Sequence, residues 1–313
     1  MADKIATRES YGKALAEFSD KYDIIVLDAD LAAATKTGIF KKACPDRFFD
    51  CGIAEGNMMS TAAGLATCGK TVFASSFAMF AAGRSFEQIR NSICYPNLNV
   101  KIGATHGGIS VGEDGATHQC LEDIGIMRTI PNMVVINPAD DVEARAAVEA
   151  AIKHDGPVYL RFCRLATEVM YDKENFEFEI GKGITLKEGT DVTLIANGLM
   201  VEKAVEAAKL LEAEGISAGV LDMHTVKPID KELVLKAAKE TGAIVTAEEH
   251  NIYGGLGSAV AEVVCEGTPV PVLRVGTEDK FGKSGKPAEL FELYGLTAEN
   301  IVNKAKCAIA LKK

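Results

Sequence analysis

The fold is decided by the stretch from residue 133 to 162. It reads Met133-Val-Val-Ile-Asn137, then Ala139-Asp-Asp-Val-Glu-Ala-Arg-Ala-Ala-Val-Glu-Ala-Ala-Ile152, then Val158-Tyr-Leu-Arg-Phe162. The outer segments are short apolar runs and predict buried strands. The middle segment has the spacing of an amphipathic helix over 139–154, with acids in its first turn. A strand, a helix and a second apolar strand predict part of a parallel sheet that helices cover on both faces.

The same alternation extends in both directions along the chain. Upstream, helical patterns at 8–21, 55–68 and 78–94 alternate with strand-like runs at 23–28, 71–75 and 99–104. Downstream, strands at 191–197, 217–222, 243–248 and 270–275 alternate with helices at 200–214, 230–240 and 257–266, and two more helical segments follow. The charged, irregular span 166–190 predicts a linker. We therefore expect an α/β protein of two three-layer domains with mostly parallel sheets, at 1–165 and 191–313.

Composition excludes several classes of function. The 313 residues include 34 Lys and Arg against 44 Asp and Glu, a net charge of −10. Nucleic acids and anionic membranes both need basic partners, so we expect neither. The polar N-terminal segment lacks the apolar run of a secretory signal. The eight cysteines form no Cys-x-x-Cys pair and most lie in apolar segments, which predicts reduced core cysteines in a cytoplasmic protein.

Two glycine-rich segments resemble nucleotide-binding motifs but depart from them. Gly276-Thr-Glu-Asp-Lys-Phe-Gly282-Lys-Ser284 has five residues between its glycines where a P-loop has four. Gly255-Leu-Gly257-Ser-Ala-Val260 has a valine where a dinucleotide fingerprint needs a small residue. A tight turn into a helix is the simpler interpretation of the second segment, and a nucleotide-binding protein remains a minor alternative.

Three segments between residues 50 and 120 carry the chemistry. Asp50-Cys-Gly-Ile-Ala-Glu55-Gly-Asn-Met-Met-Ser-Thr-Ala-Ala-Gly64 sets a lone carboxylate before an apolar helix. Phe73-Ala-Ser-Ser-Phe77-Ala-Met-Phe80-Ala-Ala-Gly-Arg84 has two aromatic residues that share a helix face. Ala104-Thr-His106-Gly-Gly-Ile-Ser-Val-Gly-Glu113-Asp114-Gly-Ala-Thr-His118-Gln119 is a polar loop after a strand, where α/β folds bind ligands.

Each of these residues also has a plainer interpretation. Glu55 alone is typical of an acid at a helix N-terminus, and Phe77 and Phe80 are typical of a core. His106 and His118 are compatible with structural histidines or with metal ligation beside Glu113 or Asp114, although their spacing on a loop matches no known ligand pattern.

Taken in order, the segments resemble the C-terminal half of transketolase, from about residue 8 to the C-terminus. The shared motifs are Gly-Ile-Ala-Glu-x-Asn-Met, Ser-Phe-Ala-x-Phe, His-x-Gly-x-Ser-x-Gly-Glu-Asp-Gly-x-x-His-Gln, Leu-Arg-Phe-Cys-Arg164 and Glu248-Glu-His-Asn-Ile-Tyr-Gly-Gly-Leu-Gly-Ser258. The resemblance implies a thiamine-diphosphate enzyme with a pyrimidine-binding domain followed by the family's C-terminal domain. Single motifs are weakly specific, whereas their order along the chain is strongly specific.

The resemblance also implies a partner. Full-length transketolase begins with a domain whose Gly-Asp-Gly…Asn motif holds a Mg²⁺ or Ca²⁺ ion on the cofactor diphosphate, and this chain contains no Gly-Asp-Gly. We therefore expect the C-terminal subunit of a split transketolase, with no metal ligands of its own. Two copies of each chain would form a cytoplasmic heterotetramer that acts in carbohydrate metabolism, in the pentose phosphate pathway.

The family pattern assigns roles to the matching positions. Glu55 matches the glutamate that hydrogen-bonds the pyrimidine N1′ of the cofactor, a role that burial beside an apolar helix favours. Phe77 and Phe80 match the aromatic residues that pack on the pyrimidine ring. His106 and His118 match histidines near the reacting carbonyl and hydroxyl groups, and we expect them to shuttle protons because imidazole titrates near neutral pH.

Further matches concern the substrate. Asp114 matches a residue that contacts a substrate hydroxyl, and Arg164 matches a phosphate-binding arginine, with Arg161 a weaker candidate. A serine of the family that also contacts phosphate is replaced by Ala34, for which Thr35 or Lys36 could compensate.

The expected activity is transfer of a two-carbon ketol unit from a ketose phosphate, such as xylulose 5-phosphate, to an aldose phosphate, such as ribose 5-phosphate. The alternatives keep the fold: the β subunit of a 2-oxoacid dehydrogenase, or a half of a 1-deoxyxylulose-5-phosphate synthase-like enzyme. The Gly-Glu-Asp-Gly-x-x-His-Gln loop favours transketolase. A non-catalytic subunit is a third possibility, which the retained Glu55, His106, His118 and Arg164 disfavour.

Overall fold

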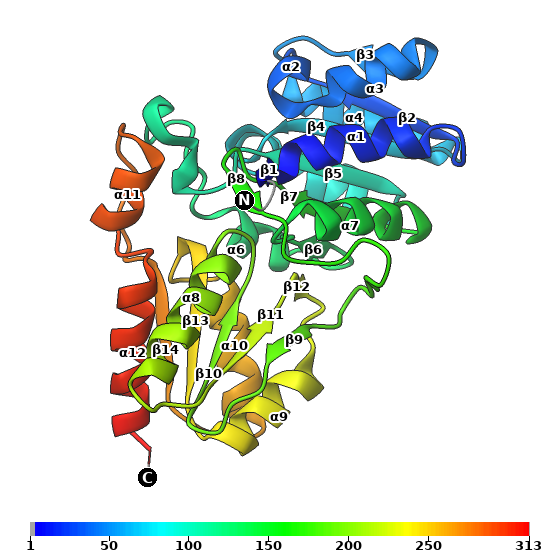
Figure 1. Cartoon of the computed structure of the whole chain (residues 1–313). Helices are drawn as coiled ribbons and strands as arrows, with labels where there is room; N and C mark the ends of the chain where they lie inside the picture. The colour runs from blue at the N-terminus through cyan, green and yellow to red at the C-terminus, as the bar shows by residue number, and fades with distance from the viewer. Residues whose placement is uncertain (1–3, 313) are drawn as a thin grey trace.

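The computed structural model describes residues 4–312, so the ends of the predicted domains at 1–3 and 313 lie outside the described residues. It consists of two bodies, each with a central sheet that helices flank (Figure 1). The expectation of an α/β fold with two mostly parallel sheets is confirmed. None of the helices within 4–312 combines the length and apolar character that crossing a membrane requires.

The first sheet has seven strands in the order β12-β6-β7-β5-β4-β2-β3. Six come from the first half of the chain and run parallel: β2 (Ile24–Asp28), β3 (Phe48–Asp50), β4 (Thr71–Phe77), β5 (Val100–Thr105), β6 (Val134–Ile136) and β7 (Val158–Arg161). The stretch from 133 to 162 thus forms the unit β6, α7 (Asp141–Lys153), β7. Helix α7 begins after Asp140, whose carboxylate accepts the backbone N–H of Glu143 as an N-cap.

Helices cover both faces of this sheet because alternate strand residues are apolar on both sides. Along β2, Ile24 and Val26 belong to one core cluster, whereas Ile25 and Leu27 belong to another. The first face packs against α1 (Thr7–Phe18), α3 (Thr37–Ala43) and α7. The second face packs against α4 (Glu55–Thr67), π-helix η3 (Ile89–Cys94) and α6 (Asp123–Arg128).

The second sheet has five strands in the order β14-β13-β10-β11-β9. Four are parallel: β10 (Val192–Ala196), β11 (Ala218–Asp222), β13 (Ile244–Asn251) and β14 (Val272–Thr277). Strand β9 (Ile184–Lys187) is antiparallel. One face carries α8 (Met200–Ala213) and α12 (Ala298–Ala310), and the other carries α9 (Lys231–Thr241) and α10 (Leu256–Glu266). A further helix, α11 (Pro287–Leu293), lies beside the loop that contains η4 (Ile109–Asp114).

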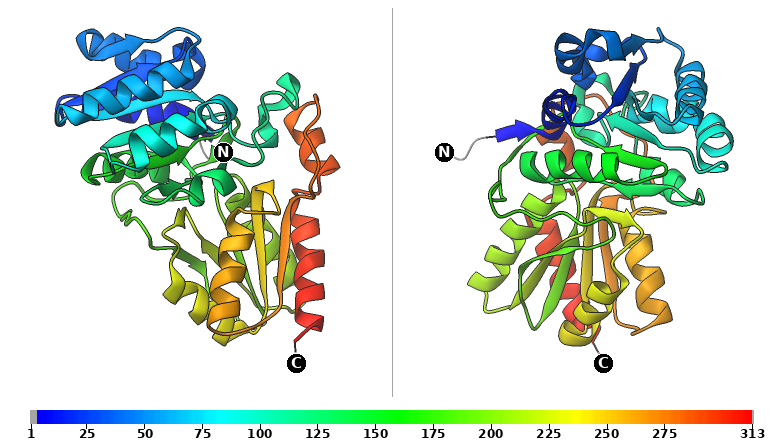
Figure 2. Two further views of the ribbon diagram at one scale, coloured as in Figure 1. Left: turned by 180° about the vertical axis from the view of Figure 1, so that it is seen from behind. Right: turned by 90° about the vertical axis from the view of Figure 1, so that its right-hand side faces the viewer.

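Two pairings join distant parts of the chain. Strand β12 (Thr225–Lys227), from the second half, pairs antiparallel with β6 and so extends the first sheet. Strand β1 (Lys4–Ala6) pairs antiparallel with β8 (Ala166–Glu168), which ties the N-terminal segment to the chain that leaves the first sheet. The bodies therefore stack closely, with the N-terminal segment at their junction (Figure 2).

Two of the predicted spans differ in the structure. The span 78–94, predicted as one helix, is divided into π-helix η2 (Met79–Arg84), α5 (Phe86–Gln88) and η3. The span 166–190, predicted as a linker, contains β8 and β9. Strand β8 pairs with β1, and β9 pairs with β11 in the second sheet; the charged composition of the span does not reveal this strand pairing.

The prediction of core cysteines holds for a minority of them. All eight cysteines are described and unpaired, and three of them are buried: Cys94, Cys120 and Cys163.

Candidate active site

Glu55 is the first residue of α4, at the edge where parallel strands β2, β3 and β4 end. Its side chain is buried, with 3 % of its surface exposed, and Met58 and Met59 behind it are core residues. The Nη1 atom of Arg84, in η2, lies 2.8 Å from both carboxylate oxygens. The chain thus buries one carboxylate at a strand-end edge and pairs it with a guanidinium that stays half exposed.

Four rings gather beside this carboxylate. Phe77, at the end of β4, stacks on Phe80 with ring centroids 6.0 Å apart and planes 14° apart. His106, after β5, stacks on Phe77 at 3.8 Å, and His118 meets Phe80 edge-on at 5.3 Å. Arg84 lies over the face of Phe80, 4.7 Å from its centroid. The structure therefore brings together four of the predicted site residues and links them to Glu55 through Arg84.

His106 is held with a defined pattern of hydrogen bonds. It has a positive φ of 58°, which turns its ring from the strand toward Phe77. Its Nε2 lies 2.9 Å from Nη1 of Arg8, and since a guanidinium can only donate, Nε2 accepts. Its Nδ1 lies 2.9 Å from the Thr105 hydroxyl. Burial, followed by the charges of Arg8 and Arg164, lowers the pKa of His106 to about 3.

This environment corrects one expectation and disfavours another. His106 was expected to shuttle protons because imidazole titrates near neutral pH. With its pKa lowered to about 3, the His106 ring stays neutral in that range, so this argument does not apply to it. Both of its ring nitrogens are already engaged, which disfavours the metal alternative with His118. His118 is half exposed, and its Nδ1 lies 2.9 Å from the Thr117 hydroxyl.

Arg8 is the site residue that sequence reasoning missed. Its Nη1 donates to His106 and to the carbonyl oxygen of Ala34, 3.0 Å away. The β1–β8 register sets Ala6 opposite Ala166, which places Arg8 and Arg164 next to each other two residues farther along. Burial and the charge of Arg164 lower the pKa of Arg8. No local sequence pattern around Arg8 signals this meeting of two positive charges.

The loop around η4 lies beside Arg164. Arg164 Nη1 is 3.7 Å from a carboxylate oxygen of Glu113 and 3.8 Å from one of Asp114, and it also donates to the carbonyl of Val111. Glu113 and Asp114 are exposed. The predicted substrate-contacting residues Asp114 and Arg164 therefore lie together, with the carboxylate facing the guanidinium.

Two weaker sequence candidates are fully buried and already paired within the core. Arg161 is fully buried, and its Nε pairs with Asp123 at 2.8 Å while a terminal nitrogen donates to the backbone of Glu249. It therefore braces the junction between the two bodies and does not reach a phosphate. Thr35 is also fully buried, and its hydroxyl donates to Asp28 at 2.7 Å. Of the two residues proposed to compensate for Ala34, only Lys36 is partly exposed.

The two glycine-rich segments have structural uses. The carboxylate of Glu248 accepts the backbone N–H groups of Leu256 and Gly257, at 2.7 and 2.8 Å, and so fills the N-terminus of α10 where a dinucleotide phosphate would lie. The segment 276–284 leaves β14 and packs on the loop of Gln119, which donates to the carbonyl of Lys283. Neither segment supports a nucleotide site.

Comparison with known proteins gives a consistent result. Residues 3–169 match the family "Transketolase, pyrimidine binding domain", and residues 181–301 match "Transketolase, C-terminal domain". A protein of Methanocaldococcus jannaschii named for the C-terminal section of a transketolase is 51 % identical over 95 % of this chain and 94 % of its own length. A 6-deoxy-6-sulfo-D-fructose transketolase subunit of a Clostridium species is 48 % identical over 95 % of this chain and 92 % of its own length.

A solved structure described as a split gene transketolase, an inactive beta4 tetramer, superposes with a TM-score of 0.93. It is 56 % identical and covers 99 % of this chain and 100 % of its own. By contrast, the match to the transketolase of Rattus norvegicus, 41 % identical over 98 % of this chain, spans 49 % of the rat protein.

Proposed function

Since the chain belongs to the transketolase family, as the C-terminal half that some members carry on a separate polypeptide, we propose that it transfers a two-carbon ketol unit from a ketose phosphate to an aldose phosphate. The observation that carries the proposal is an unbroken series of contacts. It runs from Glu55 through Arg84, Phe80, Phe77 and His106 to Arg8. The first end of the series, with Glu55, Phe77 and Phe80, is the proposed cofactor end. The second end, at Arg8, is the proposed anion-binding end.

The residues at the first end fit the aminopyrimidine of thiamine diphosphate. A buried carboxyl suits a polar ring edge, and the stacked rings of Phe77 and Phe80 suit a flat face. When bound, thiamine diphosphate supplies the nucleophilic carbon that carries the two-carbon unit. Glu55 would hold a proton at the pyrimidine N1′, for which Arg84 would give up one of its two carboxylate contacts. Phe77 and Phe80 would orient the ring and exclude water.

The residues at the second end fit the phosphate of a sugar. Arg8 and Arg164 offer adjacent guanidinium groups, and Lys36 adds a positive charge that acts on His106. Asp114 and His118 would contact substrate hydroxyls on the way from that anion to the cofactor. His106, being neutral, would accept a hydrogen bond at Nε2, either from Arg8 or from a substrate hydroxyl that takes the place of Arg8.

We further propose that the diphosphate and its Mg²⁺ or Ca²⁺ ion are held by a partner subunit, in a cytoplasmic heterotetramer of two copies of each chain. The similarity to relatives named as subunits or as a section supports a partner. So does the solved relative described as an inactive tetramer of one chain type. The pentose phosphate pathway is the proposed setting. The Clostridium relative is named for a sulfonated sugar, so a sulfonate is the competing anion.

The test is reconstitution. A tagged copy of this chain is used to capture its partner from the source cells, and the assembled enzyme is supplied with thiamine diphosphate and Mg²⁺. Ketol transfer from xylulose 5-phosphate to ribose 5-phosphate, absent with either chain alone, is expected. Preference for 6-deoxy-6-sulfo-fructose would reassign the anion, and turnover of pyruvate without ketol transfer would overturn the proposal in favour of a 2-oxoacid dehydrogenase.

A further inference from the structure

The loop that carries Asp114 and His118 rests on the second body through Gln119. The Gln119 side chain is 3 % exposed, and its Nε2 lies 2.9 Å from the carbonyl oxygen of Lys283, in the loop between β14 and α11. The same nitrogen lies 3.2 and 3.1 Å from the carbonyl oxygens of Ile109 and Gly112, at the start and in the middle of η4. One buried amide therefore fastens both η4 and the second body.

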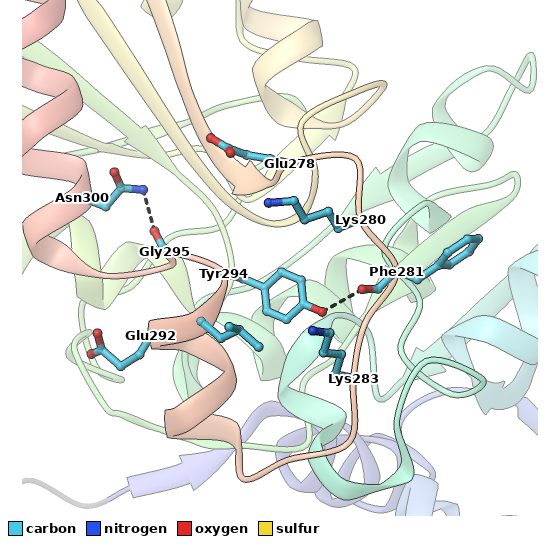
Figure 3. A pocket seen from close by; sticks show the side chains of 9 residues that line it. Glu278, Lys280, Phe281, Lys283, Glu292, Tyr294, Gly295 and Asn300 are labelled. Carbon is cyan, nitrogen blue, oxygen red and sulfur yellow. Dashed lines mark hydrogen bonds between the residues drawn. The ribbon is translucent and has the colours of Figure 1, made fainter.

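Glycines make this close approach possible. A Cβ atom on Gly282 would lie 1.7 Å from Oε1 of Gln119, so any larger residue there would force the Gln119 amide to move. A Cβ atom on Gly115 would lie 2.4 Å from the Ser284 hydroxyl, and Gly115 has a positive φ of 75° as well. In the segment opposite η4, the Tyr294 hydroxyl donates to the carbonyl of Phe281 at 2.7 Å (Figure 3).

The position of Gln119 in the chain makes the contact relevant to substrate. It directly follows His118, and η4 ends at Asp114. The backbone N–H groups of His118 and Gln119 both donate to the carbonyl of Gly115, so backbone hydrogen bonds tie the turn that follows Asp114 to Gln119. A shift of the Gln119 amide would therefore displace both residues assigned to substrate hydroxyls, while Glu55 and the two phenylalanines stay in place on other elements.

We propose that Gln119 and Gly282 form an interdomain joint, through which the C-terminal domain positions Asp114 and His118 for the sugar. Gln119 is a positioning residue in this proposal, because its amide contacts backbone carbonyls and not the reacting atoms. The kinetic part of the inference rests on the proposed function, whereas the joint itself is a property of this chain.

The experiment compares Gly282→Ala, Gln119→Ala and the double variant. In the reconstituted enzyme, either single change is expected to lower kcat/KM by about 10- to 100-fold, mostly through a higher KM for xylulose 5-phosphate, because small displacements of positioning groups have effects of this size. The double variant should be no worse than Gln119→Ala, since truncation leaves room for the new methyl group. Lys280→Ala, an exposed change in the same loop, is the matched control and should leave KM unchanged.

A second readout does not depend on activity. Hydrogen exchange of the unassembled chain should become faster at the amides of 109–119 in both single variants, with α7 as protected as before. Faster exchange in 109–119 together with an unchanged KM would overturn the positioning role. Unchanged exchange at 109–119 would overturn the joint. The joint would also be overturned if the single variants lost protection throughout the chain and their effects on kcat/KM were additive in the double variant. A wild-type enzyme without ketol transfer would overturn the proposed function, and exchange would still decide the joint.

Discussion

Arg84 holds the carboxylate of Glu55 symmetrically, with its Nη1 atom 2.8 Å from each oxygen. The carboxylate is buried, whereas the arginine is half exposed and leans on the face of Phe80. One member of this ion pair still reaches water. The free-energy cost of separating the pair is therefore modest, and the buried carboxylate can exchange its partner. The pair therefore keeps Glu55 oriented in the free chain, and it leaves the carboxylate able to exchange this partner, as the proposed contact with a pyrimidine nitrogen requires.

Replacing Glu55 by Gln tests this arrangement. Glutamine keeps the size of the side chain but cannot take up and return a proton, so turnover of the reconstituted enzyme should fall by roughly 10²–10⁴-fold. Glu87→Gln is the control, because Glu87 is an exposed acid in α5, near Arg84. Steady-state kinetics with xylulose 5-phosphate and ribose 5-phosphate provides the measurement. Near-normal turnover of Glu55→Gln would remove Glu55 from the chemistry.

Replacing Arg8 or Arg164 by Ala should raise KM for phosphorylated sugars by roughly 10- to 150-fold each, the range for one lost charge-assisted hydrogen bond, with a smaller effect on kcat. A donor that lacks the phosphate should be affected much less. Arg145→Ala is the control, since Arg145 pairs with Glu17 on the surface. If Arg8→Ala leaves KM unchanged while Arg164→Ala raises it, the anion site consists of Arg164 without Arg8.

The low pKa of His106 gives a prediction about its ionisation. With a folded pKa of about 3, set by burial and by Arg8 and Arg164, the ring should stay neutral across pH 5–8. Nitrogen NMR of labelled histidine should find a neutral ring with its proton on Nδ1, because Nε2 accepts from Arg8. Removing one of the charges in Arg8→Gln should raise this pKa. A His106 signal that titrates near pH 6.5 in the wild-type chain would contradict the assigned environment.

His106 also contributes to stability in a defined pH window. Its pKa is lower in the folded chain than in the unfolded chain, so the unfolded state binds more protons between about pH 3 and 6.5. The contribution of His106 is therefore complete above the unfolded pKa and is lost as the pH falls. In His106→Asn, the free energy of unfolding, measured by denaturant titration, should fall less steeply as the pH is lowered than in the wild-type chain. An unchanged slope would argue against the lowered pKa of His106.

A buried pair of carboxyl groups between the two bodies, Glu143 and Asp222, changes the stability with pH in the opposite direction to His106. Burial raises the pKa of Asp222 to about 7 and raises that of Glu143 well above its ordinary value, and one oxygen of each carboxyl is buried without a hydrogen-bond partner among the described residues. The Tyr171 hydroxyl also donates to Asp222, at 2.7 Å. A raised folded pKa means that the native state holds the extra proton, so this stabilisation is present below about pH 4 and is lost as the pH rises through 7.

Glu143→Gln mimics the protonated partner and should flatten this loss. The free energy of unfolding, measured between pH 5 and 8, should fall less steeply with pH than in the wild-type chain. The exposed acid Glu266 supplies the matched control as Glu266→Gln, which should keep the wild-type slope. Equal slopes for all three proteins would mean that the pair shares no proton in this range.

Local patterns predicted the elements well where a single element carries the signal. The apolar runs at 133–137 and 158–162 became β6 and β7, and the acids after Ala139 became the cap and first turn of α7. The span 78–94 was predicted less well, because π-type turns in η2 and η3 keep nearly helical spacing while they shift the faces. Glu55 follows β3 and Phe77 ends β4, and both strands end at one edge of the sheet, so their proximity was predictable from the order of elements.

The sequence by itself determined the two-domain α/β fold, the family and the positions at which strand ends present polar and aromatic groups, because periodicity, capping and motif spacing are local properties. Only the tertiary structure decided which charges meet. The β1–β8 pairing sets Arg8 beside Arg164, burial pairs Arg161 with Asp123, and Gln119 fastens the loop of Asp114 and His118 to Lys283. These relations depend on hydrogen bonds between segments far apart in the chain, and on the exclusion of water that packing brings about.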